Sequence, residues 1–251
     1  MREAVVTFPS FAEFFKAVTD RDPYAWQRSL ADHLREHGRW PWHVDVPTGL
    51  GKTSCIDIAV YELARQAHHG GRRTAPQRIF HVVDRRTIID SAVDHARTLA
   101  QRVTEATAGP LVTIRAALSW LEAAGSDEVI HVTGIHGQES DDRQWMQRVT
   151  GCTIVSLTSH QYVSRLLLRG YGVSPGTRPV AASLCAIDRL VLFDEPHLST
   201  QAVHTILATE RLQDRATEHL ELPRPSTVLL GATVPSYLTE LGAGSIRVDA
   251  D

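Results

Sequence analysis

The sequence has 251 residues, of which 43% are hydrophobic and 22% are charged, and it carries a formal net charge of −3. This composition is ordinary for a globular domain. It is not that of a passive nucleic-acid binder, which is usually basic, so contacts with nucleic acid are expected to be local and few. No apolar run approaches the roughly 20 residues that cross a bilayer, and the first ten residues do not form a secretory signal, so no membrane partner is expected.

The cysteines point to a reducing environment. Cys55, Cys152 and Cys185 lie far apart, and no Cys-x-x-Cys pair occurs. A disulfide framework and a structural zinc site are therefore not expected, and a cytoplasmic location is predicted.

In chain order, the sequence opens with two helices. Ser10 followed by Glu13 matches a capping box, which predicts a first helix at Phe11–Thr19. A second helix is predicted at 24–37, because Gly38 is a typical helix terminator. We assign residues 1–38 to this N-terminal helical addition and 39–251 to the main domain.

The main domain alternates apolar strands with helices. Strands are predicted at 42–46, 78–83, 128–132, 153–156, 189–193 and 226–230, and long helices at 53–69 and 87–107. Two segments with glycine and polar residues, 134–142 and 169–179, are predicted to be long loops. Because strands alternate with helices, the sequence predicts an α/β fold with a mostly parallel sheet covered on both faces.

The sharpest motif is Pro47-Thr48-Gly49-Leu50-Gly51-Lys52-Thr53, which follows a predicted strand and begins a predicted helix. In a phosphate-binding loop, the glycines let backbone N–H groups turn toward phosphate oxygens, and the helix N-terminus favours the negative charge. Lys52 is expected to reach the β- and γ-phosphates of ATP, and the Thr53 hydroxyl to bind Mg²⁺. Thr48, Gly49 and Gly51 complete the predicted loop. The alternative is a glycine-rich turn that happens to precede Lys-Thr.

An acidic pair follows a later apolar strand, in Leu190-Val191-Leu192-Phe193-Asp194-Glu195-Pro196-His197. Ligands bind at the carboxyl ends of strands in open parallel sheets. Asp194 is expected to hold Mg²⁺, and Glu195 to orient the attacking water. The alternative is a strand that ends in an acidic helix cap.

These motifs resemble those of superfamily 2 helicases. Asp194-Glu195-Pro196-His197 resembles their Asp-Glu-x-His box, and Tyr24-Ala25-Trp26-Gln27 resembles the glutamine motif that recognises adenine. Residues 82–86 and 158–161 resemble motifs Ia and Ib, which touch the nucleic-acid backbone, and Gly231-Ala232-Thr233 resembles motif III. The resemblance implies a RecA-like fold.

The resemblance also implies roles for particular side chains. Gln27 would bind adenine, although it could be a polar position on an amphipathic helix. One of Arg85 and Arg86 would face solvent or a carboxylate, and the other would meet phosphate together with Thr158. His197 and Thr233 would couple hydrolysis to movement, although His197 could be a buried structural histidine.

Within the superfamily, the chain resembles the helicase–nuclease of type I CRISPR systems. The matching stretches are Val83-Asp84-Arg85-Arg86-Thr87-Ile88-Ile89-Asp90, residues 164–172, and Phe11-Ala12-Glu13-Phe14-Phe15-Lys16-Ala17, which is similar to subtype I-U (I-G). This resemblance implies single-stranded DNA, a second motor domain, a nuclease and a CRISPR surveillance complex as partners. The chain is expected to lack the second motor domain, and none of its 13 histidines precedes an aspartate, as the nuclease motif requires.

The sequence thus predicts the first motor domain of an ATP-dependent translocase, which hydrolyses ATP as part of a longer protein. By itself the chain is expected to bind ATP but to hydrolyse it slowly, because the arginine finger of this superfamily comes from the second domain. The alternatives are another superfamily 2 translocase, from restriction or repair, and a nucleotide-binding scaffold that never turns over.

Overall fold

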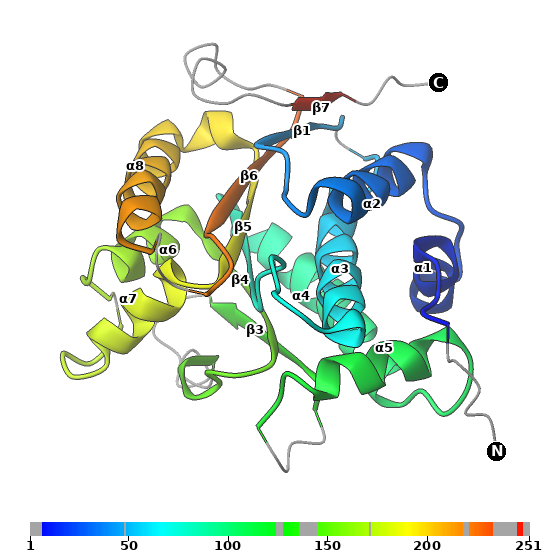
Figure 1. Cartoon of the computed structure of the whole chain (residues 1–251). Coiled ribbons are helices and arrows are strands. Elements are labelled where there is room, and N and C mark those ends of the chain that lie inside the picture. Colours follow the sequence, from blue (N-terminus) through cyan, green and yellow to red (C-terminus); the bar gives the residue numbers. More distant parts are fainter. Residues whose placement is uncertain are drawn as a thin grey trace.

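A computed structural model describes residues 7–47, 49–123, 128–135, 145–170, 172–217, 221–232 and 245–247. At its centre is a sheet of seven described strands, whose order is β3-β4-β2-β5-β6-β1-β7 (Figure 1). The strands are β1 His43–Asp45, β2 Arg78–Val83, β3 Ile130–Ile135, β4 Cys152–Thr158, β5 Arg189–Asp194, β6 Ser226–Leu230 and β7 Ser245–Arg247. Neighbouring strands in this order are parallel, so their carboxyl ends lie along one edge of the sheet. The predicted α/β class is confirmed.

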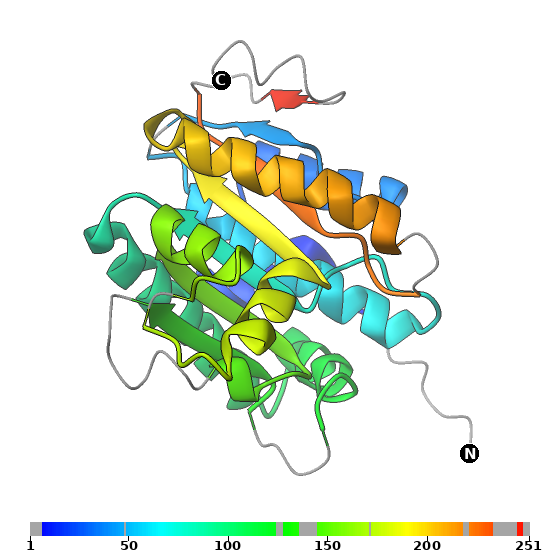
Figure 2. The same cartoon turned by 90° about the vertical axis from the view of Figure 1, so that its left-hand side faces the viewer.

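Helices cover both faces of the sheet. One face carries α1 Phe11–Thr19, α2 Ala25–His37, α3 Cys55–His69, α4 Arg86–Thr104 and α5 Pro110–Ser119 (Figure 1). The other carries α6 Ser159–Leu166, α7 Arg178–Ala186 and α8 Thr200–Thr217, which lie in front of the sheet in Figure 2. A buried hydrophobic cluster fills the space on each side. No described helix combines the length and apolar character needed to cross a membrane.

The N-terminal helices form where local signals place them. The Ser10 side chain accepts from the Glu13 backbone N–H, and the Glu13 carboxylate accepts from the Ser10 N–H, which completes the predicted capping box. Helix α2 ends at Gly38, whose φ of 64° lies in the left-handed region. Phe11, Phe14 and other residues of α1 and α2 are buried in the same cluster as α3. The division of the chain at residue 38 stays a prediction.

Several boundaries, and one strand, differ from the sequence prediction. A 3₁₀ turn, Lys52–Ser54, precedes α3. Gly134 and Ile135, predicted as loop, belong to β3, which is the edge strand of the described sheet and tolerates polar residues there. Arg178 and Pro179, also predicted as loop, begin α7, because proline fits the first turn of a helix. Strand β7 is absent from the prediction, since three residues are too few to show a periodic pattern. The rest of the predicted 134–142 loop lies outside the described residues.

Candidate nucleotide site

The phosphate loop connects β1 to α3. Gly49 and Gly51 have φ values of 90° and 75°, which only glycine adopts without strain. The turn places Lys52 and Thr53 at the start of the helical segment, with Ser54 N–H donating to the Gly51 carbonyl at 3.0 Å. Thr48 lies outside the described residues.

The acidic pair lies at the end of β5. Asp194 is the last residue of the strand, and Glu195 follows in a left-handed conformation with φ 49° and ψ 61°. A glutamate rarely adopts this conformation, and its strain is characteristic of functional sites. The Glu195 N–H donates to the Leu230 carbonyl of β6 at 3.1 Å, which fixes the turn.

Lys52 and the acidic pair form one charged cluster. The Lys52 Nζ atom lies 3.1 Å from Asp194 Oδ1 and 2.5 Å from Glu195 Oε1. Strand β6 separates β1 from β5 in the sheet, so the lysine reaches across its end. Burial lowers the pKa of Lys52, but its hydrogen bonds and charge attraction to Glu195 and Asp194 outweigh this and raise it. Lys52 is therefore held as a cation beside two carboxylates.

Two side chains of α2 hold the phosphate loop. Gln27 is buried, its Oε1 accepts from the Tyr24 N–H at 2.8 Å, and its Nε2 donates to Ser54 Oγ at 2.6 Å. Ser54 Oγ in turn donates to the Gly51 carbonyl at 2.7 Å. The Trp26 indole N–H donates to the Leu50 carbonyl at 3.1 Å. The polar position of Gln27 on an amphipathic helix therefore has a specific partner at the loop, and adenine recognition stays a prediction.

A cavity of about 500 Å³ opens beside the loop. Residues from the loop, α1, α2 and α4 line it, among them Gly49, Thr53, Tyr24, Gln27, His95 and Arg102. This volume is within the ~300–1,000 Å³ range of small-ligand sites. Sequence reasoning found the loop and Gln27 but missed the wall that α4 contributes.

The α4 wall contains a histidine that pairs with a buried carboxylate. His95 Nε2 lies 3.0 and 2.9 Å from the two carboxylate oxygens of Asp57, a fully buried residue of α3. Burial opposes the charged form of His95, but the hydrogen bond and charge attraction to Asp57 raise its pKa. The sequence offers no spacing signal for this pair, because Asp57 and His95 belong to different helices.

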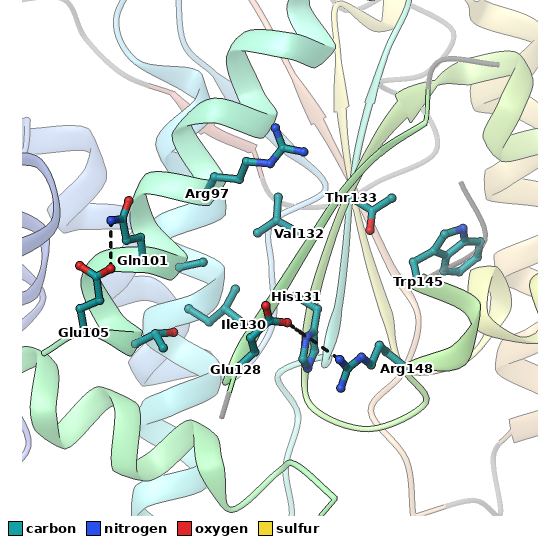
Figure 3. Close-up of a pocket in the computed structure, with 12 residues that line it drawn as sticks. Arg97, Gln101, Glu105, Glu128, Ile130, His131, Val132, Thr133, Trp145 and Arg148 are labelled. Atoms are coloured by element: carbon teal, nitrogen blue, oxygen red, sulfur yellow. Dashed lines mark hydrogen bonds and ion pairs between the residues drawn. The ribbon is translucent and has the colours of Figure 1, made fainter. Parts of the chain in front are cut away.

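A second cavity, of about 380 Å³, lies between α4 and β3. Figure 3 shows Arg97, Gln101 and Glu105 on one wall and His131, Trp145 and Arg148 on the other. No residue of the phosphate loop or the acidic pair lines this cavity. Gly49, Gly51 and Thr53 of the loop line the first cavity, which is therefore the candidate nucleotide cavity. The charged cluster of Lys52, Asp194 and Glu195 lies outside its described lining.

The predicted nucleic-acid contacts lie along the same sheet edge. Arg85 and Arg86 follow β2 and are exposed. Thr158 ends the adjacent strand β4, where it pairs with Val83, and its side chain accepts from the Gln161 N–H at the start of α6. The structure thus places these residues side by side, at the edge that also carries Asp194.

The predicted coupling residues are only partly described. His197 is not buried: its side chain is 37% exposed, and its Nδ1 lies 3.5 Å from Glu195 Oε2. The alternative of a buried structural histidine is therefore wrong. Gly231 also adjoins the pair, since a Cβ added there would lie 3.4 Å from Glu195 Oε2. Thr233 lies outside the described residues.

Solved structures of other proteins have a fold similar to this one. No family model and no curated protein match the sequence. The chain is similar to the yeast DEAD-box splicing factor Prp28, with 13% identity and a TM-score of 0.58, over 98% of this chain and 51% of that one. It is also similar to the DUF1998 helicase MrfA, with 14% identity and a TM-score of 0.60, over 94% of this chain and 32% of that one.

The chain shares a RecA-like α/β fold with these structures. In this RecA-like fold the loop after β1 and the acidic pair after β5 meet at the carboxyl edge of the sheet. The chain spans about half of the first matched structure and about a third of the second.

Proposed function

We propose that this chain is the ATP-binding first motor domain of a superfamily 2 helicase. The observation that carries the proposal is the ion-pair cluster in which Lys52 of the glycine loop meets Asp194 and Glu195 at 3.1 and 2.5 Å. A lysine, a glycine loop and a carboxylate pair at one sheet edge are the parts that phosphoryl transfer from a nucleoside triphosphate requires. A glycine-rich turn without function would not need the carboxylates.

The donor atoms fit Mg²⁺, a hard cation that prefers oxygen ligands. Asp194 Oδ1 is buried and, apart from its ion pair with Lys52, accepts no hydrogen bond among the described residues. Asp194 and the Thr53 hydroxyl would hold the ion, which would neutralise charge on the phosphates. Phosphate oxygens would compete with the two carboxylates for the Lys52 ammonium, and Glu195 would then orient water.

We further propose that the chain acts on single-stranded DNA as part of a CRISPR-associated helicase–nuclease, together with a second motor domain and a surveillance complex. The residue stretches that resemble this family support the proposal. So does the position of Arg85, Arg86 and Thr158 along the carboxyl edge of the sheet, which also carries Asp194. The three cysteines are free and buried, and we propose a reducing cytoplasm as the location of the protein. Sequencing the neighbouring genes would distinguish this role from restriction or repair.

Titration calorimetry with Mg-ATP tests the nucleotide site. The sequence contains two lysines, Lys16 and Lys52, so a matched control exists. Lys52→Ala should abolish or strongly weaken binding, whereas Lys16→Ala, at an exposed ion pair with Asp22, should leave it unchanged. Equal affinities for wild type and Lys52→Ala would refute the assignment. A phosphate-release assay on the longer parent protein, with and without single-stranded DNA, would separate a motor from a scaffold that never turns over.

A further inference from the structure

The segments that follow β4 and β5 both contact the carboxylate of Asp84, which follows β2 and is not part of the proposed nucleotide site. Asp84 Oδ1 accepts hydrogen bonds from Ser159 Oγ at 2.7 Å and from Ser199 Oγ at 2.6 Å. The two serine oxygens lie 3.0 Å apart. Hydroxyl-to-carboxylate bonds of this length are among the stronger hydrogen bonds of proteins.

The position of the cluster in the sheet makes it a junction. Asp84 follows β2, which lies between β4 and β5, and it therefore reaches both neighbours. Ser159 begins α6 directly after β4 and is fully buried. Ser199 precedes α8 and lies four residues after Glu195. Asp84 itself precedes Arg85, so the junction joins the proposed nucleic-acid contacts to the acidic pair.

The cluster has fewer protons than short contacts. Each serine hydroxyl has one proton to donate, so two protons serve three oxygen–oxygen contacts. Either both serines donate to Asp84, or one serine donates to the other while the second donates to Asp84. The cluster can therefore rearrange without losing a hydrogen bond. A shift of one of these segments changes which hydrogen bonds the other two residues make.

The same serines face a groove. Ser159 and Ser199 line a cavity of about 570 Å³ between the starts of α6 and α8, together with His160, Arg169 and Thr200. Ser159 directly follows Thr158, the last residue of β4, so one wall of this groove begins at the carboxyl edge of the sheet. A ligand that moves the walls of the groove therefore acts directly on the hydroxyls that Asp84 holds.

We propose that Asp84 is a positioning residue that couples nucleic-acid binding to nucleotide binding, by holding Ser159 and Ser199 in one hydrogen-bonded cluster. The inference rests on the proposed function, because it requires both ligands to bind. Coupling between two ligands is a ratio of affinities, and it is reciprocal. A residue that serves only as a structural strut would change stability or both affinities, but not this ratio alone.

The experiment measures the Kd of a non-hydrolysable ATP analogue with Mg²⁺, in the absence and presence of saturating oligo-dT. Wild type is expected to bind the analogue at least about fivefold more tightly with oligo-dT, the lower end of measured couplings. Asp84→Ala should bring the ratio close to one, and the ratio is the readout because it does not depend on either affinity alone. Asp84→Asn keeps an acceptor oxygen for both serines and should restore the coupling.

Two further variants complete the design. Ser199→Ala removes only the link toward the acidic pair and should also abolish the coupling, so it decides the question if Asp84→Ala fails to fold. Asp94→Ala, at an exposed carboxylate of α4 with 77% side-chain exposure, is the control and should leave the ratio unchanged.

Each outcome is decisive. Coupling that persists in Asp84→Ala, or that is lost equally in Asp84→Asn, would overturn the inference. Parallel weakening of both ligands in Asp84→Ala would assign it a structural role instead. A wild type that binds both ligands without coupling refutes the inference alone, whereas a wild type that binds neither refutes the proposed function and the inference with it.

Discussion

Replacing Lys52 should destabilise the protein before any ligand is added. The side chains of Lys52, Asp194 and Glu195 are 10%, 13% and 25% exposed, so Lys52→Ala leaves two largely buried carboxylates without their cation. Breaking a fully buried ion pair costs about 3–5 kcal/mol and an exposed one about 0–1 kcal/mol. For this partly open cluster we expect a loss of about 2 kcal/mol, which lies between these limits. In a domain of this size that loss lowers Tm by roughly 4–8 °C.

The same variant should acquire a response to magnesium. Without the lysine, the carboxylate pair is open to a divalent cation, and binding to the folded state alone stabilises it by mass action. A Mg²⁺ concentration ten times its Kd raises the free energy of unfolding by about 1.4 kcal/mol. Adding 10 mM Mg²⁺ should therefore recover part of the lost Tm. Lys16→Ala, whose ion pair is 64% and 68% exposed, should change neither Tm nor its dependence on Mg²⁺.

Thermal melting of the three proteins, with and without 10 mM Mg²⁺ and with no nucleotide, provides the measurement. Calcium chloride and sodium chloride at equal ionic strength separate specific binding from screening. If Lys52→Ala melts with wild type, the lysine does not hold the carboxylates. If Mg²⁺ stabilises all three proteins equally, the freed carboxylate pair is not its site, and the reasoning from the charged cluster fails.

Three further predictions address the sheet edge, the core and the chemistry. The double variant Arg85→Ala, Arg86→Ala should weaken binding of labelled oligo-dT, measured by fluorescence anisotropy. The slope of log K against log salt concentration should flatten by about 0.7 for each phosphate that is no longer neutralised. An unchanged slope would show that neither arginine belongs to the nucleic-acid-binding surface. Burial lowers the pKa of His81 to about 4, so between that pH and about 6.5 the unfolded chain binds more protons than the folded one, and stability should fall as the pH falls through this window. In urea unfolding, His81→Gln should show a shallower decline of stability with falling pH. A decline equal to that of wild type would contradict the lowered pKa of His81. In the longer parent protein, Glu195→Gln should slow phosphate release without weakening Mg-ATP binding in calorimetry, and undiminished release would deny Glu195 its role with the attacking water.

Much of the fold follows from local signals in the sequence. The limits of α1, β2 and β6 match the predicted ones, because a capping box or a dense apolar run bounded by polar residues marks each of them. Boundaries failed where the signal is weak. Gly134 belongs to an edge strand that needs no apolar pattern, and Pro179 fits the first turn of α7 rather than a loop.

The candidate nucleotide site could be predicted only in part. The loop before Lys52 and the pair at Asp194 are contiguous motifs, and the parallel sheet brings their strand ends together. The Asp57–His95 pair and the Asp84 cluster could not be predicted, since each joins residues far apart in the chain through helix packing or strand order. A sequence motif is recognised by residues a few positions apart, so it cannot reveal contacts between residues that are distant in the chain.

The central claim is that Lys52 is the phosphate-binding lysine of an ATP site. Protein grown with lysine labelled with ¹³C at Cε gives two lysine signals in an NMR spectrum, and Lys16→Ala assigns them. Because Asp194 and Glu195 raise the pKa of Lys52, its signal should titrate at a higher pH than that of an ordinary lysine. Adding Mg-ATP should shift the Lys52 signal and leave that of Lys16 in place. A Lys52 signal that does not move at saturating Mg-ATP would contradict the account.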